Sequence, residues 1–386
     1  MDKKIKIAIV RTDSNSVSAD FYNSQEIGLA RGISLLGIDT DVFIAGDSKH
    51  TKISSIETSG NGEIRLHKLR FFRLPAIGHA LYPELQGHIK AGNYDFVQVN
   101  EYNEFTSYLV ARFCFKNGIP VVIYQGMYKR LTGRVSNLFQ NTYDALLVPR
   151  LQHYLYRTVA KTTWAQRYLR KLGFEDVKVI PVGLDTLPFR MTKTTDWIKK
   201  LQIPTDHQVV LYVGVFEERR NIDLMLDIAA ALRNQKVTFV LVGEGDIFPK
   251  IQDRKNQEEL DNVVLTGSIP QEKLPGLYDI AALFLLPSEY EIFGMVVLEA
   301  MYFGTPVISS RTAGPDNIIN HGLDGILLDG FQSKHWSNTV SNLLESQDTL
   351  TAMSETAKNN VKANFTWEVI SQQYVETLIL PATHEG

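Results

Sequence analysis

Residues 287–315 read PSEYEIFGMVVLEAMYFGTPVISSRTAGP, and this stretch indicates the fold of the chain. The apolar run AALFLL at 281–286 predicts a buried strand directly ahead of it. Gly294 then predicts a tight turn into a helix over 295–302, and a second apolar strand is expected over 305–309. Alternating strands and helices of this kind are typical of a parallel α/β sheet.

Two carboxylates lie on either side of the predicted helix start. Glu291 precedes the helix, and Glu299 lies inside it, about 12 Å further along at a rise of about 1.5 Å per residue. The N-terminus of a helix that follows a parallel strand binds anions through its free N–H groups and its dipole. The two acids can therefore flank a bound phosphate and bind the hydroxyls on either side of it, as a nucleotide-sugar requires. The alternative is that both are solvated residues on the helix surface.

Around these two acids the stretch carries an ordered set of further features. They are a serine, Phe-Gly, Glu-Ala, Gly-Thr-Pro-Val and Gly-Pro, at Ser288, Phe293, Gly294, Glu299, Ala300, Gly304, Thr305, Pro306, Val307, Gly314 and Pro315. The set resembles the signature of the retaining glycosyltransferases of family 4, which have the GT-B fold. The resemblance implies two Rossmann-like, doubly wound α/β domains facing a central cleft, retention of anomeric configuration and no required metal or cofactor.

The resemblance also implies roles for the residues of the second half. Glu291 would hold sugar hydroxyls and Glu299 the ribose, while Arg220 and the more weakly matched Arg219 would bring positive charge to the diphosphate. The glycine of the family's Gly-Arg-x5-Lys-Gly segment matches here, although Val215 replaces its arginine. The remaining donor-binding positions implied are Gly214, Ser268, Ile269, Phe293, Gly294 and Met295.

The acceptor side of the resemblance is looser. The first loop of the chain carries Ser16 and Ser18, where the family usually has glycines, and the resemblance implies that this loop contacts the acceptor. Many family members have a histidine where this chain has Gln125. Glutamine does not titrate, so Gln125 can orient a hydroxyl but cannot act as a general base. A front-face mechanism, in which the donor phosphate takes the acceptor proton, needs no such base.

A chain of 386 residues favours two domains. We expect an acceptor-binding domain over 1–183 and a donor-binding domain over 184–365. A last helix over 366–380 is expected to pack back on the first domain. A single cysteine, Cys114, excludes an internal disulfide and fits a reducing, cytoplasmic environment. The motif Asp39-Thr40-Asp41 matches a metal-binding Asp-x-Asp, but its position before a strand favours a turn instead.

Charge divides unevenly along the chain. Residues 1–190 hold 25 Lys and Arg against 17 Asp and Glu, while the remainder is acidic. Basic and aromatic residues alternate over 65–73, in a stretch that predicts either contact with an anionic membrane or an edge strand with solvated charges. The residues concerned are Arg65, Lys68, Arg70, Phe71, Phe72 and Arg73. No feature indicates nucleic-acid binding.

These features predict transfer of a hexose from a nucleotide-sugar, most simply a UDP-sugar, to a glycan or lipid-linked acceptor in cell-surface polysaccharide synthesis. The expected location is the cytoplasm, with peripheral contact at the inner membrane face. Two alternatives stay open. One is another GT-B activity, such as a nucleotide-sugar epimerase or a phosphorylase. The other is a non-catalytic, nucleotide-sugar-binding partner subunit, which the departures at Val215 and Gln125 would allow.

Overall fold

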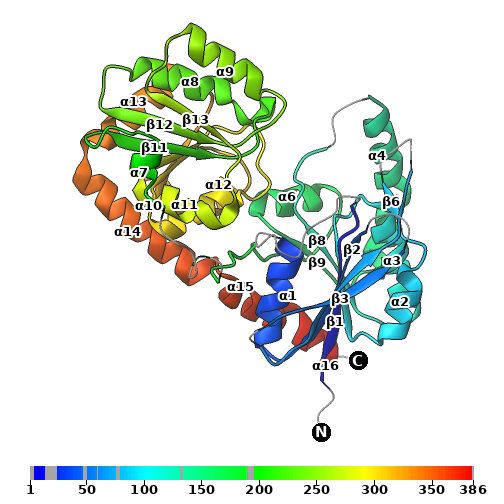
Figure 1. The fold of residues 1–386 in the computed structure, drawn as a ribbon. Coiled ribbons are helices and arrows are strands. Elements are labelled where there is room, and N and C mark those ends of the chain that lie inside the picture. The colour runs from blue at the N-terminus through cyan, green and yellow to red at the C-terminus, as the bar shows by residue number, and fades with distance from the viewer. Residues whose placement is uncertain are drawn as a thin grey trace. The chain divides into compact units, whose positions relative to one another are not determined.

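The computed structural model describes residues 4–13, 24–46, 50–58, 60–74, 79–130, 134–187, 189 and 195–384. The chain forms two compact units, one of Met1–Asp185 with Phe365–Gly386 and one of Thr186–Asn364. Each unit is built on its own, mainly parallel sheet (Figure 1). The predicted fold class, an α/β protein with two Rossmann-like domains, is confirmed.

The sheet of the first unit has the order β10-β9-β8-β7-β1-β2-β4-β3, with only the β3–β4 pair antiparallel. Chain order reverses between β1 and β7, so the loops after these two strands diverge at the carboxyl edge, where ligands bind in such folds. The strands are β1 (Lys6–Val10), β2 (Asp39–Ala45), β3 (Lys52–Ile56), β4 (Ile64–Leu69), β7 (Phe96–Asn100), β8 (Val121–Gln125), β9 (Arg157–Ala160) and β10 (Lys178–Val179), with β5 (Phe72–Arg73) and β6 (Ala80–Leu81) forming a separate hairpin.

The helices of this unit are α1 (Gln25–Leu35), α2 (Leu85–Gly92), α3 (Phe105–Lys116), α4 (Arg134–Leu146), α5 (Val148–Tyr154) and α6 (Thr163–Lys171). The helical period over 138–155 predicts one helix kinked at Pro149. The structure instead has two helices, and Pro149 lies in the first turn of α5, where its missing N–H costs nothing.

The end of the chain returns to the first unit. Helix α15 (Trp367–Tyr374) continues through a π-helical turn (Val375–Ile379) into α16 (Leu380–His384). Figure 1 shows α15, in red, beside α1, in blue. The contact is close because Gly28 has no side chain, and a Cβ there would lie 1.9 Å from Nε1 of Trp367. Tyr374 is fully buried and donates to Oε1 of Gln98 in β7 at 2.5 Å.

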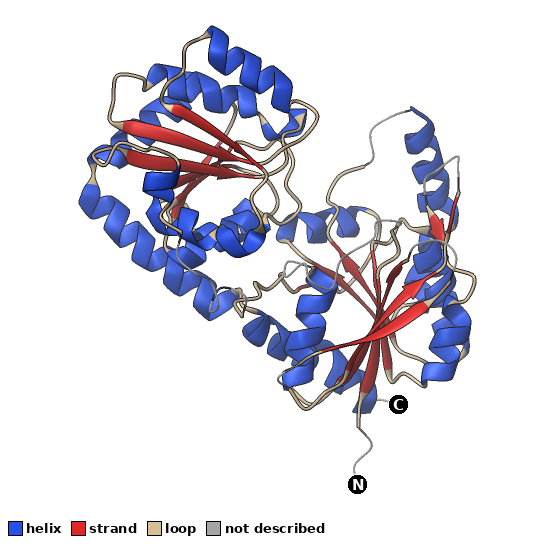
Figure 2. Ribbon diagram, in the orientation of Figure 1, coloured by secondary structure: helices blue, strands red, loops and turns tan. Residues whose placement is uncertain are grey.

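The second unit has the sheet order β13-β12-β11-β14-β15-β16, all parallel, with helices on both faces (Figure 2). Its strands are β11 (Gln208–Val213), β12 (Val237–Val242), β13 (Val263–Gly267), β14 (Ala281–Leu286), β15 (Val307–Ser310) and β16 (Gly325–Leu328). Its α-helices are α7 (Trp197–Lys200), α8 (Ile222–Ala231), α9 (Phe248–Gln257), α10 (Pro275–Ile280), α11 (Met295–Phe303), α12 (Pro315–Ile318), α13 (Ser333–Glu345) and α14 (Gln347–Asn364). The switch in chain order falls between β11 and β14.

The first part of the basic stretch 65–73 lies in an inner strand, β4, and not in the edge strand that the sequence offers as an alternative. β4 lies between β2 and β3. Arg65 binds the Asp41 carboxylate of β2 through Nε at 2.8 Å and Nη2 at 3.3 Å, and Leu66 and Leu69 are buried. The part that faces solvent is Arg70, Phe72 and Arg73, with the Arg70 guanidinium 4.8 Å from the centre of the Phe72 ring. Lys68 and Phe71 are half-buried.

The turn predicted at Asp39–Asp41 is wrong, because these residues begin β2, where Asp41 is the centre of a buried polar cluster. Burial raises the pKa of its carboxyl, but contacts with His67, Tyr94 and Arg65 outweigh burial and hold that pKa well below its usual range. Among the residues that the structure describes, no group of His, Cys, Asp and Glu is arranged to hold a metal ion. Within the same residues, no helix is both long and apolar enough to cross a membrane.

Candidate functional site

The loop from β14 to α11 lies at the carboxyl edge of the second sheet, next to the loop that follows β11. Hydrogen bonds to backbone carbonyls join the two loops. The Glu289 N–H donates to the carbonyl of Arg219 at 2.8 Å, Arg219 Nη1 donates to the carbonyl of Tyr290 at 2.8 Å, and Asn221 Nδ2 donates to the carbonyl of Pro287 at 3.0 Å. The switch point of the sheet is therefore one connected site built from two segments about 70 residues apart.

Arg220 and Glu291 form an ion pair at the centre of this site. Arg220 Nη1 donates to the Glu291 carboxylate and, at 3.2 Å, to Oγ of the buried Ser288. Only 14% of the Arg220 side chain and 12% of the Glu291 side chain are exposed. Arg220 Nε is buried and has no hydrogen-bond partner in the described part of the chain. A buried N–H without an acceptor is costly, so this atom points to a ligand that accepts from it.

The Arg219 side chain, the more weakly matched phosphate cation, is held by its neighbours. Its guanidinium donates to both carboxylate oxygens of Glu217, at 2.8 and 3.1 Å, and to the Tyr290 carbonyl. A forked pair of this kind fixes the side chain and neutralises its charge. Arg219 thus holds the loop after β11 against the loop before α11, and its predicted contact with the diphosphate stays a prediction.

The loop before α11 is shaped by close packing. Gly294 has φ of 85°, a left-handed conformation that favours glycine, and α11 begins at the next residue, Met295. Phe293 is buried, and a Cβ on Gly314 would lie 1.8 Å from the Phe293 carbonyl oxygen. The Gly314 N–H donates to the Glu291 carbonyl at 3.3 Å. The glycine after β15 thus positions Glu291, while Met295 is half-buried at the first turn of the helix.

Glu299 lies on the buried face of α11. The residue is completely buried, and its Oε2 accepts from the Tyr278 hydroxyl of α10 at 2.8 Å. A buried carboxylate requires such donors, because desolvation alone would force it to take up a proton. The ribose contact expected for Glu299 stays a prediction.

The other predicted donor residues lie at the ends of β11 and β13. The Gly214 N–H donates to the Val242 carbonyl at 3.0 Å, and a Cβ on Gly243 would lie 1.9 Å from the Gly214 carbonyl oxygen. Ser268 is exposed and Ile269 half-buried. The Ser268 N–H donates to Oε1 of Glu244 at 3.3 Å, so a nucleotide base would have to share or displace that bond. The structure thus brings these residues to the same sheet edge as Arg220 and Glu291.

Gln125, an acceptor-site residue that the sequence predicts, is held by the backbone of two loops, and its contact with an acceptor hydroxyl stays a prediction. It is completely buried at the end of β8, where its Oε1 accepts from the Tyr102 N–H at 2.8 Å and its Nε2 donates to the Met127 carbonyl at 3.1 Å. Both ends of the amide are used by the backbone, so Gln125 shapes the loops after β7 and β8. Ser16 and Ser18 lie outside the described residues.

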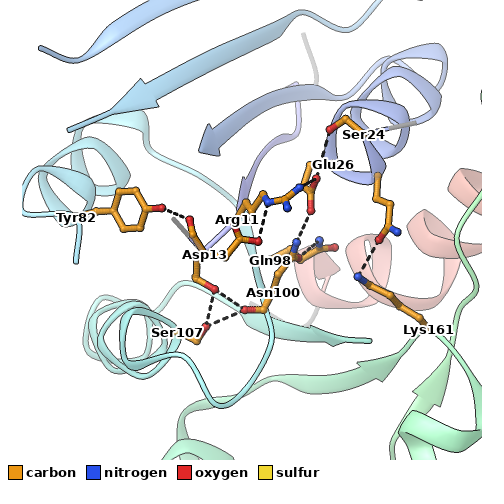
Figure 3. Close-up of polar contacts among 11 residues, drawn as sticks. Arg11, Asp13, Ser24, Glu26, Tyr82, Gln98, Asn100, Ser107 and Lys161 are labelled. Carbon is orange, nitrogen blue, oxygen red and sulfur yellow. Dashed lines mark hydrogen bonds and ion pairs between the residues drawn. The ribbon is translucent and has the colours of Figure 1, made fainter. Parts of the chain in front are cut away.

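A polar cluster that the sequence motifs do not indicate lies at the carboxyl edge of the first sheet (Figure 3). Glu26 accepts from Arg11 at 3.3 Å, from Asn100 at 2.6 Å and from Ser24 at 3.4 Å, while Lys161 donates to the side chain of Gln25. Arg11, Asn100 and Lys161 each end or directly follow a strand. Polar residues at the carboxyl ends of strands are therefore the signal in the sequence that points to this cluster.

Glu104 is a second residue that the sequence analysis missed. Its Oε2 is buried with no hydrogen-bond partner among the described residues, and it lies 3.6 Å from Nδ1 of His79. Burial, with the nearby carboxylates of Asp13 and Glu101, raises the pKa of Glu104 to about 7. Nothing in its sequence neighbourhood indicates this environment.

Comparison with known proteins places the two units in one family. Residues 27–186 match the profile of Glycosyltransferase Family 4, and residues 193–360 match that of Glycosyl transferases group 1. The chain belongs to this glycosyltransferase family. The family resemblance predicted from the motif around Glu291 is confirmed.

Curated relatives are distant and match in part. A D-inositol 3-phosphate glycosyltransferase of Thermobispora bispora is 30% identical over 57% of this chain and 55% of its own length. A GDP-mannose-dependent alpha-mannosyltransferase of Corynebacterium glutamicum is 26% identical over 57% of this chain and 51% of its own length. The chain thus spans about half the length of these relatives.

Solved structures resemble nearly the whole chain. Anabaena HepE in complex with UDP superposes on this chain with a TM-score of 0.73 at 20% identity, and the match covers 97% of this chain and 99% of HepE. At that identity the likeness concerns the fold alone, which is GT-B.

Proposed function

We propose that this protein is a retaining glycosyltransferase that moves a hexose from a nucleotide-sugar, a UDP-sugar, to a glycan or lipid-linked acceptor in cell-surface polysaccharide synthesis. The observation that carries the proposal is the buried Arg220–Glu291 pair, with the unpartnered Arg220 Nε beside it. The guanidinium and the start of α11 would face the diphosphate, and Glu291 would face the hexose.

Charge grows on the diphosphate as the bond to the sugar breaks. Cationic and dipolar groups that are already fixed at that position lower the barrier selectively, because they bind the transition state better than the ground state. Ser288, Glu291 and the contact that Arg219 makes between the two loops hold Arg220 in place before the donor arrives. These groups supply the positive charge that a metal supplies in other transferases, so we propose that transfer does not require a metal.

The acceptor proton has no side-chain base at Gln125, whose amide is occupied by the backbone. This supports a front-face mechanism in which an oxygen of the leaving phosphate takes the proton from the attacking hydroxyl. The new glycosidic bond then forms on the face that the phosphate leaves, and configuration is retained.

The nucleotide of the donor is the next part of the proposal. HepE was solved with UDP, whereas the Corynebacterium relative is named for GDP-mannose. A thermal-shift panel of UDP-, GDP- and ADP-hexoses decides between them, because a ligand at about a hundred times its dissociation constant adds about 2.7 kcal/mol to the free energy of unfolding. A response to GDP- or ADP-sugars alone would overturn the UDP assignment.

The matched test of activity compares wild type with Glu291→Gln, which keeps the size of the side chain but removes its charge. We expect loss of transfer to a glycan acceptor mixture, with folding intact by circular dichroism. Turnover of the donor to its epimer without an acceptor would instead indicate an epimerase, and phosphate-dependent cleavage of a glycan a phosphorylase. Unchanged transfer in Glu291→Gln would refute the role given to this site.

We also propose peripheral, cytoplasmic action at the inner membrane face. Of the basic stretch, only the exposed part around Arg70, Phe72 and Arg73 supports it. Co-sedimentation with anionic vesicles, compared with neutral ones, provides the test. Equal binding to both would refute this contact.

A further inference from the structure

Lys161 is a buried cation at the carboxyl edge of the first sheet. Only 7% of the residue is exposed. Its ammonium donates to Oε1 of Gln25 at 2.8 Å and lies 5.2 Å from the centre of the Tyr124 ring. An ammonium has three N–H donors, and within the described part of the chain one of them has an acceptor, a neutral amide. No carboxylate among those residues lies within ion-pair distance of it.

The acids of this edge are already bound to another cation. Arg11 donates to Asp13 through Nε at 2.9 Å and to Glu26 through Nη1 at 3.3 Å. Glu26 also accepts from Asn100 and Ser24. Figure 3 shows Arg11, Asp13 and Glu26 together and Lys161 to one side of them. The buried positive charge of Lys161 is therefore left without an anion that the cluster could supply.

The backbone behind Lys161 adds positive potential. The next residue, Thr162, is the N-cap of α6, and its side chain accepts from the Ala165 N–H at 3.1 Å. The first turn of α6 contains no acidic residue. The positive end of the helix dipole thus reinforces the ammonium charge. Burying a charge without a counter-ion is strongly unfavourable. A buried lysine of this kind is therefore expected to bind an anionic ligand.

We propose that Lys161, at the start of α6, binds an anionic substituent of the acceptor, a phosphate or a carboxylate. Lys161 directly follows β9 at the carboxyl edge of the first sheet, and its partner Gln25 begins α1, the helix that follows β1. The site therefore borders the point where β1 and β7 diverge, and ligands bind near such a point in this kind of fold. The inference rests on the proposed function and names the class of acceptor, a sugar or polyol that carries a negative charge.

The first experiment measures binding of inorganic phosphate by calorimetry at constant ionic strength. Four proteins are compared: wild type, Lys161→Met, Arg220→Met and, as a control, Lys171→Met, which removes an exposed lysine from the same helix α6. Phosphate that binds this subsite is weakened about tenfold or more by Lys161→Met, the loss expected for one charge-assisted bond, and is unaffected by Lys171→Met.

The two substitutions separate this inference from the proposed function. Binding that is sensitive to Arg220→Met and insensitive to Lys161→Met overturns the Lys161 subsite and leaves the donor site standing. Binding that is sensitive to Lys161→Met alone supports the subsite and counts against the donor site. Binding that neither substitution changes overturns the subsite.

Stability and acceptor preference give independent readouts. If Lys161 is kept for a ligand, Lys161→Met leaves the melting temperature of the free protein unchanged or raises it, whereas a structural lysine would lower it. Glucose 6-phosphate, glucuronate and methyl glucoside then serve as acceptors, and the first two distinguish phosphate from carboxylate. We expect a charged acceptor to have a lower KM than the neutral one, and Lys161→Met to abolish that difference. A preference for methyl glucoside, or a preference kept in Lys161→Met, would overturn the inference.

Discussion

Replacing Gly314 with alanine tests how the loop before α11 is positioned. A Cβ at this residue would lie 1.8 Å from the carbonyl oxygen of Phe293, and ordinary contact begins at 3.4 Å, so the two segments must separate by about 1.6 Å. Gly314 has φ of −71° and ψ of −58°, which alanine adopts without strain. The effect is therefore steric, and it falls on backbone that is bonded to Glu291.

We expect Gly314→Ala to lower kcat/KM for sugar transfer about a hundredfold, because a displacement of about 1 Å at a reacting centre costs that much. Transfer from a radiolabelled UDP-hexose measures it, and calorimetry with UDP reports the donor site separately. Gly87→Ala is the control, since a Cβ at that helical position has no neighbour within 4 Å. Wild-type transfer and UDP affinity in Gly314→Ala would refute the close contact and the role of this loop.

Three further predictions concern buried polar groups. Tyr278→Phe removes the hydrogen bond to Glu299, and we expect it to lower the free energy of unfolding in urea by about 1.5–3 kcal/mol; an unchanged midpoint would contradict this. The folded-state pKa of Asp41 is depressed, so its stabilisation is present above its unfolded pKa of about 3.9 and is lost as the pH falls below it. Wild type should therefore lose more stability than Asp41→Asn between about pH 4 and pH 2. Glu104 has a raised pKa, so the folded state loses stability as the pH rises from 4.5 to about 7, and Glu104→Gln should remove that decline in melting temperature.

The sequence predicted the second unit well because its signals are local. β14 spans the six residues of the apolar run, and α11 ends one residue beyond the predicted helix, where Gly304 has φ of 81°. Turn glycines and short apolar runs determine the conformation of the residues next to them, so the helices and strands that they bound can be predicted from the sequence. The motif around Glu291 also identified the family.

The sequence could not indicate partners that are distant along the chain. Arg65 is paired with Asp41, 24 residues away. Its strand β4 lies inside the sheet, although the charges of this stretch predict an exposed edge strand. The Gln125 side chain accepts from the Tyr102 backbone, 23 residues away, and the Arg219 side chain donates to the Tyr290 carbonyl, 71 residues away. In each case the residue type was compatible with a ligand, and only the fold shows that the side chain is already occupied.

Calorimetry of UDP and of uridine on wild type and Arg220→Met tests the donor site most directly. Uridine lacks the diphosphate, so the ratio of the two affinities isolates the contribution of the phosphates. We predict that wild type prefers UDP and that Arg220→Met reduces this preference by about 10- to 100-fold, the effect of losing one or two charge-assisted hydrogen bonds. An equal preference in the two proteins would contradict the placement of the diphosphate at Arg220.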